Sequence, residues 1–188
     1  IAASKALDSV VGARQLTLTA EKIRRLMHYG QILQSHALHF YYLSAPDLLF
    51  GFDSAAARRN IVGIAAAYPD IARQGISLRK FGQEVIRVTA GKRIRGTSSV
   101  PGGVNKSLTR DERDFLLRDA GQMIAWSYGA VRIIKQLHQS NPALYDQFGT
   151  FRSNLMSIVA PDGAMDLYHG ALRARDADGR IIFDQVDY

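Results

Sequence analysis

The sequence of 188 residues contains no cysteine. This absence excludes disulfides, thiolate nucleophiles and cysteine-ligated metals within these residues. Long apolar runs are also missing, since a membrane-spanning helix needs roughly 18 consecutive apolar residues. Even the apolar stretch IVGIAAAY at residues 61–68 is short and has charged residues close by on both sides. We therefore expect a soluble protein.

The start of the sequence lacks a methionine and the basic-then-apolar pattern of a signal peptide. A short helix is expected over residues 2–11, ending at Gly12, yet no side chain is available to cap its N-terminus. An uncapped helix at the first residue is expected where a preceding segment has been removed. We therefore expect the sequence to be the inner part of a longer protein.

The longest helical pattern covers residues 20–44, with Thr17 or Thr19 as the capping residue. At about 1.5 Å per residue this helix would be roughly 37 Å long, enough to cross a domain. Ala45-Pro46 is expected to end it, because a residue before proline is disfavoured in the helical region. Apolar residues recur at steps of three and four and give the helix one apolar face. These residues are Ile23, Leu26, Met27, Gly30, Leu33, Ala37, Phe40 and Tyr41.

Three further helices are predicted. One covers residues 55–67 with Ser54 as its cap, and another covers residues 71–90 and ends at Gly91. The last begins with a capping box, in which Thr109 and Glu112 satisfy each other's backbone N–H groups, and extends to about residue 139. Residues 92–107 show neither helical nor strand periodicity and are predicted to form a loop.

Beyond Phe148 the pattern changes from helices to strands. Strands are predicted over residues 155–160, 167–175 and 180–185, joined by turns that contain glycine. The expected fold class is mainly α, with a bundle of long helices followed by a small antiparallel β-hairpin region, α+β overall. We expect a single partial domain over residues 1–188, with the helical bundle in 1–148 and the hairpin layer in 149–188.

Two histidines of the long helix, His36 and His39, are three residues apart and therefore lie close to one face. This spacing can hold a metal ion or relay a proton. No third ligand and no HExxH pattern accompanies them, and no carboxylate lies three or four residues from either on the helix. These observations favour hydrogen-bonded interface or core histidines over a metal site.

The segment VPGGV at Val100–Val104 allows its backbone to approach another surface closely. Gly102 and Gly103 have no side chains, and Pro101 restricts the angle at which the chain enters the turn. A phosphate-binding loop would end in GKS or GKT and follow a strand, and neither feature is found. A structural turn or a contact surface for another subunit is therefore favoured.

Charged residues give two weaker signals. The formal net charge of +7 is compatible with an acidic partner, and Lys92, Arg93, Arg95 and Lys106 bracket the flexible loop. A solvated basic face is favoured, because the other positive residues are spread along the helices among acids. The segment DADG at 176–179 resembles the start of a calcium loop, but the later glutamate is missing, so a hairpin turn is predicted.

Several segments, taken in order, resemble the large subunit of nickel–iron hydrogenases. They are MHYGQILQSHALHFYYLSAPDLLFG, ARRNIVGI, RKFGQEVI, SSVPGGVNKSL and DLYHGALRARDADG. The resemblance is closest to the cytoplasmic bidirectional group that couples hydrogen to NAD, and it extends over essentially the whole chain. Residues 2–7 resemble the helix that follows the family's N-terminal CxxC and histidine motif. The chain therefore resembles a central segment of that subunit.

The resemblance implies that the metal ligands lie outside this sequence. In the family, nickel and iron are held by two CxxC pairs, one before the equivalent of Ile1 and one beyond the equivalent of Tyr188. Neither pair is present, so this segment alone is expected to contain no metal ligand, no bound cofactor and no catalytic residue. Residues near the buried metal site and the small-subunit interface are instead expected to support it. These are Gln34, Ser35, His36 and His39.

The resemblance also implies partners. Residues Val100, Pro101, Gly102, Gly103 and Val104 match a loop that faces the small subunit with its iron–sulfur clusters. A diaphorase module, NAD as final electron acceptor and a cytoplasmic location are also implied, whereas nucleic-acid binding and membrane insertion are not expected. His169 lies in a matched hairpin motif without an assigned role.

Two hypotheses follow. In the first, the chain is the central segment of a hydrogenase large subunit that catalyses the reversible oxidation of dihydrogen when the rest of it is present. In the second, it is a short, cysteine-free remnant that serves as a non-catalytic assembly or scaffold subunit. The uncapped start and the expected exposure of large apolar helix faces favour the first.

Overall fold

The computed structural model describes residues 1–13, 15–94 and 96–187, so that Arg95 of the basic loop lies outside the described residues. The chain divides into two compact units, Ile1–Leu137 and His138–Tyr188. The division falls near the end of the longest helix rather than at Gly149, where the sequence changes from helices to strands. The single partial domain with a layer change at that point remains a prediction.

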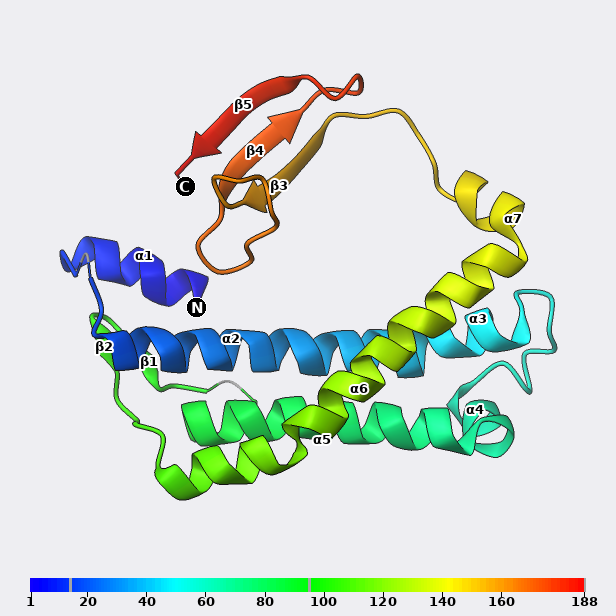
Figure 1. The fold of residues 1–188 in the computed structure, drawn as a ribbon, viewed down its shortest axis with the longest axis horizontal. Coiled ribbons are helices and arrows are strands. Elements are labelled where there is room, and N and C mark those ends of the chain that lie inside the picture. The colour runs from blue at the N-terminus through cyan, green and yellow to red at the C-terminus, as the bar shows by residue number, and fades with distance from the viewer. Residues whose placement is uncertain (14, 95, 188) are drawn as a thin grey trace. The chain divides into compact units, whose positions relative to one another are not determined.

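Two long antiparallel helices form the centre of the first unit, α2 (Leu18–Leu38) and α5 (Pro69–Ala90) (Figure 1). Glycines allow their backbones to approach closely. A Cβ on Gly30 would lie 2.6 Å from a methyl carbon of Val85, and one on Gly75 would lie 2.5 Å from Cβ of Tyr41. The cap of α2 is Thr17, whose Oγ1 accepts a hydrogen bond from the backbone N–H of Ala20.

The core of this unit consists of small clusters along the two helices. One cluster joins α2 and α5 to the helix α6 (Arg110–Ser140), which runs obliquely across them in Figure 1. Its buried members are Ala37, Tyr41, Leu78 and Met123. The short helix α1 (Ala2–Val10) precedes α2, as predicted.

The long helix does not end before Pro46, contrary to the sequence prediction. From Leu38 it continues as a π-helix, η1 (His39–Ser44), and then as α3 (Ala45–Phe50). Ala45 keeps helical dihedral angles, with φ −57° and ψ −38°, although it precedes a proline. The proline lies in the first turn of α3, directly after the π-helix, and the preceding Ala45 N–H is hydrogen-bonded to the Phe40 carbonyl.

The helix predicted over residues 55–67 is shorter than expected. Only α4 (Ile61–Ala67) is helical, and its cap is Asn60, whose Oδ1 accepts from the N–H groups of Val62 and Gly63 at 2.9 and 3.0 Å. Ser54 instead donates to the carbonyl of Gly51 within a turn. The prediction was wrong because serine and asparagine both cap helices, and the alanines at 55–57 directly after Ser54 suggested the earlier start.

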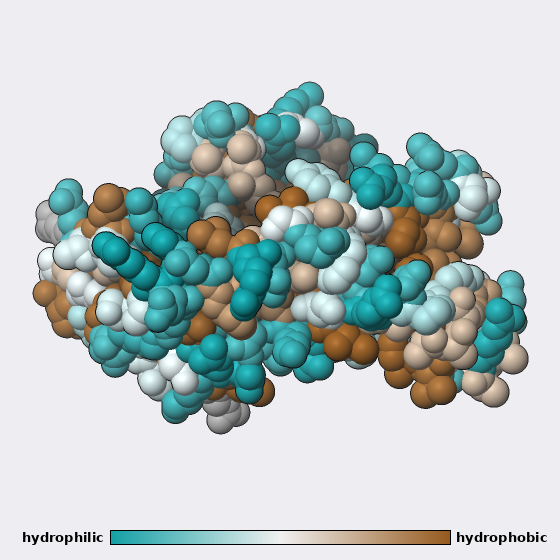
Figure 2. Space-filling model, turned by 60° about the horizontal axis from the view of Figure 1, so that its bottom comes forward, coloured by the Kyte–Doolittle hydropathy of each residue, from teal (hydrophilic) through white to brown (hydrophobic). Residues whose placement is uncertain are grey.

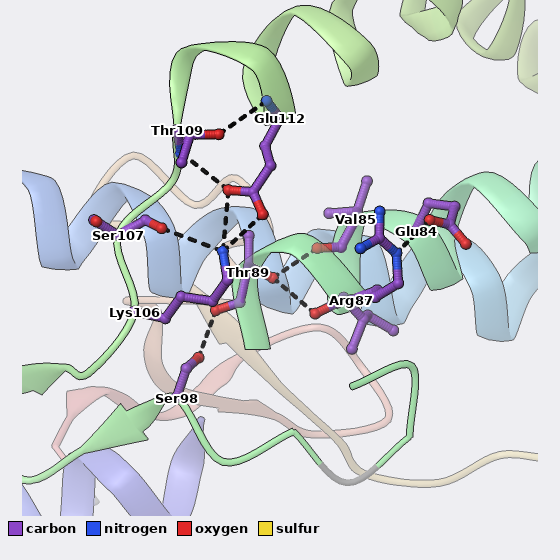
Figure 3. A network of polar contacts seen from close by, with 10 residues as sticks. Glu84, Val85, Arg87, Thr89, Ser98, Lys106, Ser107, Thr109 and Glu112 are labelled. Atoms are coloured by element: carbon purple, nitrogen blue, oxygen red, sulfur yellow. Dashed lines mark hydrogen bonds and ion pairs between the residues drawn. The ribbon is translucent and has the colours of Figure 1, made fainter. Parts of the chain in front are cut away.

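The other helix boundaries agree closely with the predictions. α5 ends at Gly91 in the left-handed conformation. The capping box of α6 is confirmed: Glu112 N–H donates to Thr109 Oγ1 at 3.1 Å, and Thr109 N–H donates to the Glu112 carboxylate at 3.0 Å (Figure 3). Between these helices, β1 (Ser99–Val100) and β2 (Gly103–Val104) form a small antiparallel hairpin where no strand was predicted.

The second unit contains α7 (Pro142–Gln147), which was not predicted from the sequence, and a three-stranded antiparallel sheet. The strand order is β3 (Leu155–Val159), β4 (Ala171–Arg175) and β5 (Ile181–Val186). β4 is shorter than predicted because residues 167–170 turn around Asp166, whose Oδ1 accepts from two backbone N–H groups. The mainly α fold with small antiparallel sheets is confirmed.

No helix in the described part of the chain combines the length and the apolar character that a bilayer crossing requires.

Candidate functional site

His36 and His39 line the same hollow on the surface of the first unit, a space of about 630 Å³. Nδ1 of His36 lies 2.9 Å from the carbonyl oxygen of Ile32, one turn earlier on α2. Because a carbonyl can only accept, Nδ1 carries the hydrogen in a neutral His36 ring, and Nε2 remains as an acceptor. Nδ1 of His39 lies 3.5 Å from Ser44 Oγ within η1. Both residues are exposed.

Gln34 and Ser35 do not join the histidines in this hollow. Gln34 is half-buried in the contact between α2 and α5, where its backbone N would lie 2.8 Å from a Cβ on Gly82. Ser35 is exposed on α2. The four residues predicted as one supporting group therefore face different surroundings, and their role remains a prediction.

Tyr41 also lines the hollow and is 2% exposed. Its hydroxyl oxygen is buried without a hydrogen-bond partner among the described residues. Burial raises the pKa of this phenol above its usual value. Tyr41 is therefore neutral at physiological pH and acts as an aromatic wall that packs on Gly75.

An apolar groove adjoins this hollow, with a volume of about 710 Å³. Tyr29, Leu33, Ser127 and Val131 line both spaces, so the two are neighbours. One wall is α6, which exposes much of its apolar surface, and hydrophobic patches are visible on the face shown in Figure 2. The exposed apolar residues of α6 in this unit are Phe115, Leu117, Ile124, Tyr128, Val131 and Ile134.

The VPGGV segment forms the turn of the β1–β2 hairpin. Val100 pairs with Gly103, which leaves Pro101 and Gly102 as the two central residues. Gly102 has φ +80°. Proline followed by a glycine with positive φ is the pattern of a type II turn. Both central residues are exposed, as the contact-surface prediction requires.

The buried side chain of Arg24 forms hydrogen bonds with the backbone of this turn. Its side chain is fully buried, and its guanidinium donates to the carbonyl oxygens of Val100 at 2.6 Å and Gly103 at 2.9 and 3.1 Å. The same guanidinium forms an ion pair with Asp8 of α1, with contacts of 2.5 and 3.1 Å. Asp8 Oδ1 in turn accepts the backbone N–H of Gly102 at 2.7 Å. One buried pair therefore connects α1, α2 and the turn.

The hydrogen bonds from Arg24 are the largest influence on the Asp8 carboxyl, and the Gly102 N–H adds to them. Together they outweigh the effect of burial and lower the pKa of Asp8 below its ordinary value. Asp8 is therefore ionised across the physiological range, and the pair carries no net charge.

Sequence reasoning missed Asp8 and Arg24. The available signal was an arginine beside Ile23, four residues after Ala20, on the side of the helix that points into the core. Charged residues are almost never fully buried unless they are paired, so an arginine in an apolar stripe predicts a buried acidic partner. The identity of the partner was not readable, because Asp8 also fits an ordinary exposed helix.

The sequence predicted a flexible loop between residues 92 and 107, but several of its described residues have ion-pair or hydrogen-bond partners. Arg93 forms an ion pair with the buried Glu84 of α5, and Lys106 contacts both oxygens of Glu112 at 2.9 and 3.0 Å (Figure 3). Ser98 donates to the carbonyl of Thr89 at 2.6 Å. Two of the predicted basic residues are thus paired with acids of this chain.

Aspartates of the second unit serve mainly as turn formers and ion-pair partners. Asp176 Oδ1 accepts from the N–H groups of Asp178 and Arg180, which confirms the predicted hairpin turn. Asp184 pairs with Arg173 at 2.7 Å. His169 is exposed, with its ring edge-on to Tyr168 at 4.6 Å.

Potential metal ligands are scattered. Within residues 1–13, 15–94 and 96–187, no group of three or more histidine, cysteine, aspartate or glutamate side chains lies close enough to bind one metal ion. The histidine hollow and the glycine turn are also separate, because Arg24 and His36 are about 18 Å apart along α2. The hollow and the turn are therefore two separate surfaces of the first unit.

Comparison with known proteins shows which class of protein the chain resembles. No family model matches the chain. It is 42% identical, over 98% of its residues, to the NAD-reducing hydrogenase HoxS subunit beta of Cupriavidus necator. It is also 42% identical, over 96% of its residues, to one of the subunits of the F420-non-reducing hydrogenase vhu of Methanocaldococcus jannaschii. The chain is thus related to hydrogenase subunits.

A solved structure gives a more particular likeness. A chain of an NAD⁺-reducing NiFe hydrogenase in the H2-reduced state matches with a TM-score of 0.95 and 54% identity over 98% of this chain. The chain spans 41% of that solved chain, and 41% and 43% of the two curated relatives.

Proposed function

We propose that the chain is the central segment of a nickel–iron hydrogenase large subunit. The complete subunit then catalyses the reversible oxidation of dihydrogen to protons and electrons. The observation that carries this proposal is the likeness to the solved NAD⁺-reducing NiFe hydrogenase, which combines 54% identity with a TM-score of 0.95. At that level the two chains share one fold over nearly the whole of this sequence.

The described residues do not fit a nickel–iron centre by themselves. There is no cysteine in the sequence, and the dispersed histidines and carboxylates do not form a ligand set. We therefore place the ligands in parts of the complete subunit outside this sequence. No step of the reaction is assigned to a residue of this chain.

The proposed role of the histidine hollow is to support that centre. His36 is held by the Ile32 carbonyl, which fixes its ring and leaves Nε2 free to accept a hydrogen bond from a neighbouring group. His39 and Ser44 lie in the π-helix, a feature frequent at functional sites. The mostly apolar lining of the hollow limits the access of water to whatever lies over it.

The proposed partners are a small subunit with iron–sulfur clusters and a diaphorase module, with NAD as the final electron acceptor and the cytoplasm as the location. The exposed Pro101-Gly102 turn is the surface assigned to the small subunit. The relative from Cupriavidus necator bears the name of an NAD-reducing hydrogenase subunit, which supports NAD over other acceptors.

The test uses the complete subunit that contains this chain, produced together with its partners. We expect bound nickel and hydrogen-dependent reduction of NAD. The His36→Ala variant should lower the rate at unchanged nickel content, whereas His138→Ala, an exposed histidine of the second unit paired with Asp146, should leave both unchanged. Loss of nickel in a folded His36→Ala protein would contradict the supporting role. A wild-type protein without nickel or hydrogen uptake would favour the non-catalytic scaffold.

A further inference from the structure

Three polar backbone groups at the Pro101-Gly102 turn are directed toward Arg24 and Asp8. The carbonyls of Val100 and Gly103 accept from Arg24, and the N–H of Gly102 donates to Asp8. Pro101 and Gly102 are both exposed, and the Pro101 carbonyl, which lies opposite the Gly102 N–H across a trans peptide bond, faces away from Asp8. The turn therefore presents a small surface on which another backbone can lie closely.

The hairpin is too short to hold this shape alone. Each strand has two residues, and an isolated two-stranded hairpin is at best marginally stable. Arg24 and Asp8 supply what the hairpin lacks. Arg24 reaches the turn from α2, which is held by its packing on α5, and Asp8, the buried residue of α1, reaches it from the other side of the ion pair. Asp8 and Gly102 are 94 residues apart in sequence, so this support comes from tertiary packing.

We infer that Asp8 and Arg24 are positioning residues that hold the Pro101-Gly102 turn in the conformation in which it contacts the iron–sulfur subunit. The inference rests on the proposed function, which places residues 100–104 against that subunit. The side-chain hydrogen bonds of Asp8 and Arg24 in the described chain join them to each other and to the backbone of the turn. Their effect passes through the backbone of the turn and therefore acts on electron transfer between subunits.

The chemistry of the pair requires an arginine. The guanidinium fork contacts both Asp8 oxygens and two carbonyls at once, a planar arrangement that a lysine ammonium cannot reproduce. Arg24→Lys keeps the charge but loses this geometry. Asp8→Asn keeps the size of the side chain but removes the charge that balances Arg24.

The experiment compares two rates in the complete enzyme, both expressed per bound nickel. Exchange of D2 with water protons needs the metal centre alone, whereas hydrogen-dependent NAD reduction also needs electron transfer to the partner. For Arg24→Lys and Asp8→Asn we expect unchanged exchange and a roughly tenfold to hundredfold loss of NAD reduction, as small misplacements produce. Equal changes in the two rates would overturn the inference.

Two further variants separate positioning from general destabilisation. Ile64→Ala opens a cavity in the fully buried centre of another cluster, away from the turn, and should alter both rates per nickel equally. Arg25→Lys changes the adjacent arginine, which pairs with Glu21 on the surface, and should change neither rate. A selective loss of NAD reduction in Ile64→Ala would show that the effect is not specific to the pair.

Amide hydrogen exchange tests the inference even if the proposed function fails. In the wild-type protein the Gly102 amide is hydrogen-bonded, so the peptide that contains residues 99–104 should exchange slowly. Asp8→Asn and Arg24→Lys should accelerate exchange there by a larger factor than in peptides of α5, whose exchange follows the stability of the whole fold. If the turn stays protected in both variants, the pair does not position it. If protection is lost but the wild-type protein shows no hydrogenase activity, the proposed function fails and the structural role stands.

Discussion

Gly82 on α5 lies so close to Gln34 on α2 that a Cβ added to the glycine would be 2.7 Å from the Gln34 Cβ and 2.8 Å from its backbone N. The same Cβ would be 2.8 Å from the carbonyl oxygen of Gly30. Two of these three neighbours are backbone atoms, which cannot rotate away. The distance between the two central helices is therefore set at a position where only glycine fits.

The first prediction follows from this contact. Gly82→Ala should force the helices apart and destabilise the protein by about 1–3 kcal/mol, the usual effect of overpacking a core. In a protein of this size such a change lowers the melting temperature by roughly 2–4 °C per kcal/mol. Thermal unfolding followed by circular dichroism measures the shift.

The matched control is Gly121→Ala on α6, where no atom lies within 4 Å of the added Cβ and the glycine is exposed. This change should stabilise the protein by about 0.5–1 kcal/mol, because alanine loses less backbone entropy than glycine in a helix. The two substitutions are therefore expected to change the free energy of unfolding in opposite directions. Stabilisation by both would show that the α2–α5 contact relaxes freely.

The second prediction concerns pH. The pKa of Asp8 is lower in the folded protein than in the unfolded chain, so its ion pair stabilises the fold fully above the ordinary aspartate pKa. That contribution decreases as the pH falls through the folded-state pKa. Asp8→Asn should be about 3–5 kcal/mol less stable at neutral pH, because Arg24 loses its buried counter-charge.

The difference in stability between wild type and Asp8→Asn should therefore shrink as the pH falls below about 4, the ordinary aspartate pKa, and urea titrations at several pH values measure it. Glu84 and Glu112 also have lowered pKa values, but they are present in both proteins and cancel in the difference. A difference independent of pH would contradict the assignment of the Asp8 charge to this pair.

Periodicity predicted the helices well, because a helix that packs on one side needs apolar residues at fixed steps. It could not predict that the chain stays helical through Pro46, since the π-helix between His39 and Ser44 has no pattern of its own. Nor did it separate Ser54 from Asn60 as the cap of α4. Such local choices depend on backbone geometry, which the order of apolar residues does not encode.

The candidate site was partly predictable. The spacing of His36 and His39 predicted that they lie close to one face, and both line one hollow, whereas their supporting role stays a prediction. The Pro101-Gly102 pair predicted a structural turn, which the hairpin contains. The pair that supports the turn was hidden, because a contact between Asp8, Arg24 and Gly102 joins three distant parts of the sequence. Side-chain partners at such separations are fixed by tertiary packing, and periodicity reports only on each helix alone.

The third prediction uses the capping box of α6. Thr109→Ala removes the oxygen that accepts the Glu112 N–H and should destabilise the protein by about 1 kcal/mol. Thr19→Ala is the control, since Thr17 rather than Thr19 caps α2 and Thr19 is exposed. Chemical denaturation should resolve the pair. A larger loss from Thr19→Ala would contradict the observed cap of α2.

The fourth prediction distinguishes the two possible caps of α4. Asn60 accepts two backbone N–H groups through Oδ1 and donates through Nδ2 to the Ala57 carbonyl at 2.8 Å. Asn60→Ala should therefore cost about 1–2 kcal/mol, at the upper end for a cap, because three hydrogen bonds are lost together. Ser54→Ala removes one exposed turn hydrogen bond and should cost less than about 0.5 kcal/mol. Amide exchange in residues 61–67 should accelerate in the first variant alone, whereas faster exchange there in Ser54→Ala would restore the longer helix that the sequence had suggested.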